Sequence, residues 1–133
     1  MFVALAAEVI VRETGDVVSM LRDYEGNSDV RIGVYRAISS APGAVDLSSV
    51  DTLSALRDQF AREGDPNCLP ALLDAARAVP EVRDEEAKRL WFEASILLLE
   101  RLGGSLGEEE RAACFELCGR FYSPSIDNGV NVR

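Results

Sequence analysis

The sequence predicts an all-α fold of six to seven helices, stacked as antiparallel hairpins into either a small right-handed α-α superhelix or an irregular bundle. Two observations lead to this prediction. Apolar residues recur at the spacing of a helix face in successive segments of the 133-residue chain. Short breaks rich in Gly, Pro, Asn and Asp separate these segments, and no segment alternates as a strand does. Helices joined by such short turns tend to pack as antiparallel hairpins.

The first predicted helix covers residues 2–12. Its apolar residues lie at helical spacing: Phe2, Leu5, Ala6, Val9 and Ile10. The β-branched run 9–11 makes a strand the alternative for this segment. A break at Thr14-Gly15-Asp16 then precedes a second helix over 17–24, with Asp16 as a possible N-cap.

Gly26-Asn27 ends the second helix, and Ser28 or Asp29 is the predicted cap of a third that reaches Ala41-Pro42-Gly43. Cap-type residues over 46–49 introduce a helix that ends near residue 63. The turn Gly64-Asp65-Pro66 is predicted to end one helix and begin the next. Gly suits the position after a helix, Asp the N-cap position and Pro the first helical position. The later predicted helices cover 69–79, 84–102 and 108–122.

The chain has the length of one ordinary domain. We expect a single helical domain over residues 1–122. Residues 123–133, "SPSIDNGVNVR", show no periodicity, and we expect an irregular C-terminal tail there.

Residues 16–42 contain Leu21-Arg22-Asp23, then a polar turn, then Val30-Arg31 and Ala37-Ile38. With these motifs the segment resembles a HEAT-type α-α repeat. In such repeats a first helix ending in Leu-x-Asp is followed by a polar turn and a second helix starting Val-Arg. Leu21-Arg22-Asp23 and Val30-Arg31 match these two motifs, and Ala37-Ile38 matches the packed face of the second helix. A weaker match over 51–80 has Leu56-Arg57-Asp58 but lacks the Val-Arg pair. The resemblance implies a stack of hairpins, since one hairpin cannot bury its apolar face alone, and a surface that binds protein.

The composition is acidic, with a net charge of −9 and a pI of about 4.5. Such a surface repels nucleic acid and anionic membranes, so we expect neither as a ligand. It suits a basic protein partner, and it equally suits plain solubility.

Cellular location is predicted from the cysteines and the first residues. Three cysteines do not form a disulfide framework, so a reduced, cytoplasmic compartment is expected. The apolar start lacks a basic leader and the length of a membrane span. Arg outnumbers Lys by 13 to 1, a bias that a GC-rich bacterial gene would produce.

Few residues suggest chemistry, and we predict no catalytic, cofactor-binding or metal-binding residue. The chain contains no His, which removes Ser-His and Cys-His dyads and the commonest zinc sites. Gly103-Gly104 lacks the context of a phosphate-binding loop. Cys114 and Cys118 share a helix face with aromatic residues, which favours small buried residues, with a redox pair as the alternative.

Candidate partner-binding residues are acidic or aromatic. The runs 84–86 and 108–110 are explained by the preference of carboxylates for helix starts, with a cationic partner as the alternative. Trp91 and Phe92 point to different faces of one helix, so one of them is a candidate interface anchor unless both are packed. The candidate set is Tyr24, Tyr35, Asp84, Glu85, Trp91, Phe92, Glu108 and Glu109.

These observations favour a non-enzymatic protein-binding module. The sharpest hypothesis, by analogy, is a small bacterial immunity protein that neutralises a toxin, because a negative surface can mimic a nuclease's substrate and speed association. A structural or adaptor domain of a larger assembly is the second hypothesis. A helical ligand-binding protein or an enzyme that uses carboxylates and Arg is the third, and it requires a cleft with convergent charged groups.

Overall fold

The computed structural model describes residues 2–41 and 43–122, and this part of the chain is helical without any strand. The prediction of an all-α fold is therefore confirmed. The elements are α1 (Phe2–Thr14), α2 (Val17–Asp23), α3 (Ser28–Ser40), α4 (Val50–Arg62), the 3-10 turn η1 (Pro66–Cys68), α5 (Leu69–Arg77), α6 (Glu85–Leu102), the 3-10 turn η2 (Gly103–Ser105) and α7 (Glu108–Phe121). The tail expected over 123–133 lies outside the described residues.

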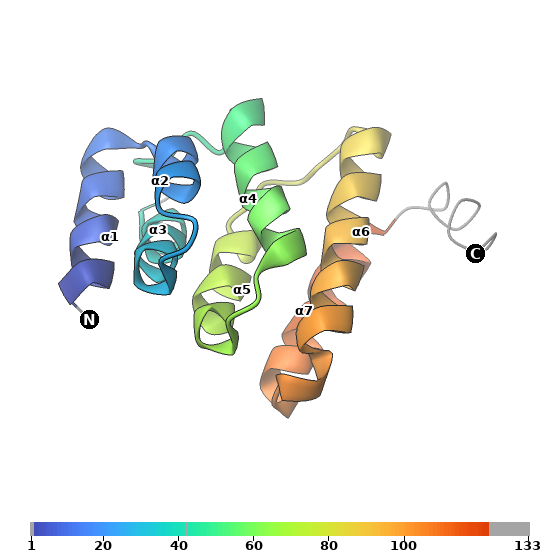
Figure 1. The fold of residues 1–133 in the computed structure, drawn as a ribbon. Coiled ribbons are helices and arrows are strands. Elements are labelled where there is room, and N and C mark those ends of the chain that lie inside the picture. The colour runs from blue at the N-terminus through green and yellow to red at the C-terminus, as the bar shows by residue number, and fades with distance from the viewer. Residues whose placement is uncertain (1, 42, 123–133) are drawn as a thin grey trace.

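The helices form two rows (Figure 1). In one row α2 packs on α4 and α4 on α6. In the other row α3 packs on α5 and α5 on α7, and α1 extends this row by packing along α3. Helix α1 thus lies at one end of the array and the α6–α7 hairpin at the other. None of the described helices is both long and apolar enough to cross a membrane.

Side-chain caps fix the starts of α2, α4, η1 and α6 at the predicted residues. The Ser49 hydroxyl accepts a hydrogen bond from the Thr52 amide, and the Asp84 carboxylate accepts one from the Ala87 amide at 2.8 Å. The start of α3 differs from the prediction, since Asn27 rather than Ser28 or Asp29 is the cap. Its side-chain oxygen accepts from the amides of residues 29 and 30.

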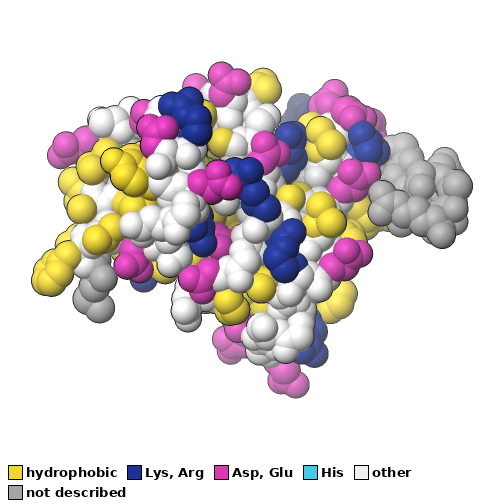
Figure 2. All heavy atoms as spheres, viewed as in Figure 1, with side chains coloured by type: hydrophobic (Ala, Val, Ile, Leu, Met, Phe, Trp, Pro, Cys, Tyr) yellow, Lys and Arg dark blue, Asp and Glu magenta, His cyan; other side chains and the backbone are white. Residues whose placement is uncertain are grey.

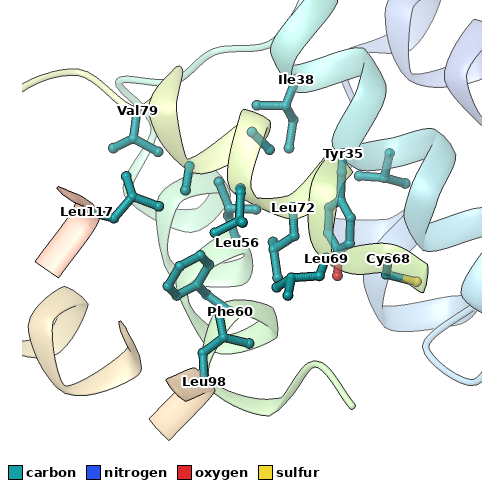
Figure 3. Packing of buried hydrophobic residues seen from close by; sticks show 14 of the residues in the cluster. Tyr35, Ile38, Leu56, Phe60, Cys68, Leu69, Leu72, Val79, Leu98 and Leu117 are labelled. Atoms are coloured by element: carbon teal, nitrogen blue, oxygen red, sulfur yellow. The ribbon is translucent and has the colours of Figure 1, made fainter. Parts of the chain in front are cut away.

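The core runs through both rows as a single cluster of buried apolar side chains (Figure 3). Its largest member is Trp91 of α6, which is 2% exposed. Trp91 stacks on Phe121 of α7, with ring centroids 5.0 Å apart, and meets Phe60 of α4 at 6.0 Å. These three aromatic rings join the last hairpin to the middle of the molecule.

Helix α1 approaches α3 unusually closely at Gly33. A Cβ atom built on Gly33 would lie 2.3 Å from the Ala4 carbonyl oxygen and 2.7 Å from the Ala7 Cβ. Only a residue without a side chain fits between these backbones. Because small residues make this contact, α1 buries Ala4, Ala7 and Val11 against the core.

The apolar residues whose spacing predicts the first helix therefore face outward. Phe2 is 87% exposed, Leu5 57%, and Val9 and Ile10 are each nearly half exposed. The helix itself was predicted correctly, and the strand alternative for residues 2–12 is wrong. Which face packs was decided by the small residues between the large ones.

Candidate functional site

The predicted partner-binding residues do not form one surface. Tyr35 and Trp91 are buried, at 0% and 2% exposure, so their inclusion as partner contacts is corrected to a role in the core. Tyr24 of α2 is 51% exposed. Phe92 is half-buried, and its ring meets the Tyr122 ring edge-on at 6.2 Å.

The four acidic candidates lie at helix starts, as their sequence positions predicted. Asp84 caps α6 and Glu85 lies in its first turn, whereas Glu108 and Glu109 lie in the first turn of α7. All four are exposed. Carboxylates at these positions stabilise the helices through the macrodipole, so their presence alone identifies no site.

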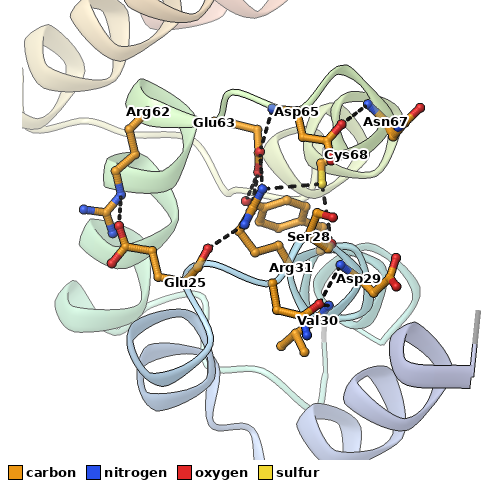
Figure 4. A network of polar contacts seen from close by, with 12 residues as sticks. Glu25, Ser28, Asp29, Val30, Arg31, Arg62, Glu63, Asp65, Asn67 and Cys68 are labelled. Atoms are coloured by element: carbon orange, nitrogen blue, oxygen red, sulfur yellow. Dashed lines mark hydrogen bonds and ion pairs between the residues drawn. The ribbon is translucent and has the colours of Figure 1, made fainter.

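Glu63, which directly follows α4, is the one buried carboxylate in the part of the chain that the structure describes. The Arg31 guanidinium donates to both carboxylate oxygens of Glu63, from Nε at 3.0 Å and from Nη2 at 2.9 Å. The Tyr35 hydroxyl donates to the Glu63 Oε1 at 2.7 Å, and the Asp65 amide donates to Oε2 at 3.2 Å (Figure 4).

This network fastens three parts of the chain together. Arg31 also donates to the Glu25 carbonyl in the loop between α2 and α3, at 2.5 Å. The Cys68 thiol of η1 donates to the Ser28 carbonyl at 3.5 Å. The hydrogen bond from Arg31 to Glu63 raises the pKa of Arg31, and burial raises the pKa of the Tyr35 hydroxyl. The network therefore holds convergent charged groups that serve to lock α3, α4 and η1 in place.

Sequence reasoning singled out Arg31 through the Val-Arg motif but missed Glu63. The two residues are 32 positions apart, and Glu63 was assigned only as the end of a helix. The signal that could have found it is a carboxylate directly before Gly64-Asp65-Pro66, where the chain turns back toward the start of α3.

A groove runs between α4 and α6 on the other row of helices. It consists of two adjoining hollows of about 190 and 180 Å³, which share Arg57 and Leu90 as lining residues. The α4 side carries Val50, Leu53, Arg57 and Ala61, and the α6 side carries Glu86, Leu90, Glu93 and Leu97. Each set repeats every three or four residues, so two parallel helix faces line a groove roughly 16 Å long.

The groove has an apolar floor and an acidic rim. Val50 is 76% exposed at one end and Leu97 is 45% exposed at the other. Four carboxylates line the two hollows, against one lining guanidinium, that of Arg57. Arg89 pairs with Glu86 and Glu93, and this contact lowers the pKa of Glu86. Figure 2 shows this face, where acidic and basic side chains surround apolar ones.

A further hollow of about 170 Å³ lies between α5 and α7. Its lining includes Asp74, Arg77, Glu109 and Glu110, so it contains one of the predicted acidic candidates. Arg77 pairs with Asp74 at 3.3 Å. This hollow is shorter and less apolar than the α4–α6 groove.

The cysteines are free thiols. Burial raises the pKa of Cys68 to about 12 and that of Cys114 to about 11, and burial also raises the pKa of Cys118. Thiols with raised pKa values are protonated at neutral pH and are poor nucleophiles, which favours the interpretation as small buried residues. Among the described residues, no group of three or more Cys, Asp or Glu side chains is placed to hold a metal ion.

Comparison of the chain with protein-family models, curated proteins and solved structures gave no significant match. The resemblance to HEAT-type repeats therefore stays a prediction. The candidate site is defined by geometry alone, and the α4–α6 groove is the surface that best combines apolar contact area with charge.

Proposed function

We propose that the protein is a non-enzymatic binding module that holds a basic amphipathic segment of a partner protein in the α4–α6 groove. The observation that carries this proposal is the combination of an apolar floor with a carboxylate rim along two parallel helices. A helix of about three turns fits a groove of roughly 16 Å, with aliphatic anchors at helical spacing on one side. Flanking Arg or Lys residues of the partner would meet Asp58, Asp84, Glu86 and Glu93, in competition with Arg57, which pairs with Asp58, and Arg89, which pairs with Glu86 and Glu93.

Within this class we propose an inhibitor, such as an immunity protein that binds a cognate toxin. A net charge of −9 speeds the approach of a basic partner and repels acidic competitors. Such steering falls steeply as salt screens the charges. Binding in the groove would supply the slow dissociation that an inhibitor needs.

An adaptor domain of a larger assembly is the alternative function, and the exposed apolar face of α1 favours it. In a helical repeat array the outer face of an end helix is normally polar, because it meets water. Here that face carries Phe2, Leu5 and Val9. An adaptor would bind through this face, and salt would affect the binding little.

A pair of matched variants distinguishes the two functions. Leu97→Ser alters the groove and Leu5→Ser alters the α1 face, and both leucines are about half exposed, at 45% and 57%. Each variant would be immobilised and used to capture proteins from a lysate of the source cell. For an inhibitor, Leu5→Ser retains a stoichiometric basic partner and Leu97→Ser loses it. For an adaptor, Leu97→Ser retains the partner and Leu5→Ser loses it.

The second readout is the association rate of the captured partner at increasing ionic strength. The proposal expects at least a tenfold slower association between about 50 and 500 mM salt. A captured partner that binds both variants equally, or whose association rate is independent of salt, contradicts the groove as the binding site.

A further inference from the structure

We propose that α1 is a homodimerisation surface, on which a second copy of this chain packs its own α1 in an antiparallel, two-fold arrangement. This inference is independent of the groove. It rests on the size of the exposed apolar face and on the distribution of charge along α1.

The apolar face is as large as a dimer of this size requires. It comprises Phe2, Val3, Leu5, Val9, Ile10 and Tyr24, each between 44% and 87% exposed. At about 150–250 Å² for an aromatic side chain and somewhat less for an aliphatic one, these six leave roughly 600 Å² uncovered. The largest apolar patch of a typical monomer is about 300–600 Å². Two such faces together reach about 1,200 Å², the lower bound of specific protein interfaces.

The face carries a protruding side chain and an apolar hollow. Phe2 is 87% exposed and projects from the start of α1. Beside it, between α1 and α2, lies a hollow of about 140 Å³ lined by apolar residues that include Ile10, Met20 and Tyr24. Burial of both against a second copy would add to the apolar area of the contact.

The charge distribution favours contact between two copies through α1 over contact through other parts of their surfaces. The chain carries −9 overall, so contact between two copies is opposed over most of the surface. Residues 2–7 contain no charge, and Glu8 is paired with Arg12 at 3.5 Å. Figure 2 shows the apolar side chains gathered at the α1 end of the molecule.

An antiparallel arrangement follows from Glu13. In a parallel pair the two Glu13 carboxylates would approach each other. In an antiparallel pair centred between Ala6 and Val9, Glu13 instead meets the first turn of the other α1, where a carboxylate is favoured by the helix dipole. Ala6 lies on the exposed side of α1, and its small side chain allows the two helices to approach closely.

Analytical ultracentrifugation of the full chain tests the dimer. At about 100 μM, where a micromolar complex is almost fully formed, we expect a species of twice the 14.5 kDa chain mass. Ala6→Glu and Phe2→Ser should weaken association at least tenfold. Ala112→Glu and Phe115→Ser are the same substitutions at exposed positions of α7, and they should leave the dimer intact.

Charge pairing tests the arrangement. Ala6→Glu and Val9→Lys should each be monomeric alone, and an equimolar mixture should form a heterodimer because the new charges face each other. Circular dichroism confirms that the variants remain helical. A monomeric wild-type chain at about 100 μM overturns the proposal, as does a dimer that survives Ala6→Glu. A mixture that stays monomeric overturns the antiparallel register.

Discussion

Glu63→Gln is the substitution that tests most directly how the fold is held together. The carboxylate is completely buried and accepts hydrogen bonds from Arg31, Tyr35 and the Asp65 amide. Every neighbour that it contacts is a donor. Gln replaces one of the two oxygens by an amide nitrogen, which cannot accept a hydrogen bond from Arg31 or from the Asp65 amide. The substitution also leaves the Arg31 guanidinium, which is 12% exposed, without its counter-charge.

The expected loss of unfolding free energy is about 3 kcal/mol. Two unit charges about 4 Å apart attract each other by about 4 kcal/mol at an effective dielectric constant of about 20. Removing one partner of a buried ion pair costs about 3–5 kcal/mol in proteins. Arg31 keeps its hydrogen bond to the Glu25 carbonyl, which places the expected loss at the lower end of this range. For a domain of this size the midpoint of thermal unfolding should fall by about 10–15 °C.

Urea unfolding measures this loss, with the fluorescence of Trp91 as the signal, because it is the only Trp in the chain and is buried. Glu25→Gln is the matched control. It removes the same charge from an exposed pair with Arg62, in which the side chains are 55% and 52% exposed. An exposed pair contributes under about 1 kcal/mol. If both variants lose the same stability, within about 1 kcal/mol, the buried network does not hold the fold as argued here.

Two further predictions concern packing and pH. Gly33→Ala should destabilise the chain by about 2–3 kcal/mol because its Cβ would clash with α1. Gly119→Ala, in α7 with open space around it, should instead stabilise by about 0.5–1 kcal/mol, and thermal unfolding of both variants checks the sign. The pKa values of Cys68 and Cys114, raised to about 12 and about 11 from 9.0, mean that the unfolded chain releases these protons from about pH 9, whereas the folded chain retains them up to about pH 12 and about pH 11. The free energy of unfolding should therefore be constant up to pH 9 and then fall, by up to roughly 1.4 kcal/mol per pH unit for each thiol. Urea titrations at pH 8 to 11 measure this slope, which should be smaller in Cys68→Ala. An unchanged slope in Cys68→Ala contradicts the assignment.

The helices could be predicted because their determinants are local. Apolar spacing and caps such as Ser49, Asp65 and Asp84 depend on residues within one or two turns, and each of these three caps its helix or turn as its sequence position suggests. The cap of α3 was misassigned by one residue because Asn27, Ser28 and Asp29 are all good caps. Which of the three becomes the N-cap depends on how the preceding loop enters the helix, and the cap preferences of single residues do not determine this.

The buried network and the groove could not be predicted, since both depend on contacts between distant residues. Arg31 and Glu63 meet only once α3 and the end of α4 are packed. Trp91 and Phe92 are adjacent and almost equally apolar, and only the position of Phe60 and Phe121 decides that Trp91 is the one in the core.

Helix α1 shows how a correct local prediction can leave the function of a helix open. A large exposed apolar face on a helix commonly marks a site of interaction. The contact at Gly33 allows the small residues Ala4 and Ala7 to pack inward, and the larger Phe2 and Leu5 remain outside. The close approach at Gly33 explains why small residues face the core, but it gives the exposed apolar side chains of α1 no role in the single chain. The proposed dimer would give them one, and substitutions on the outer face should then change association and leave the stability of the monomer nearly unchanged.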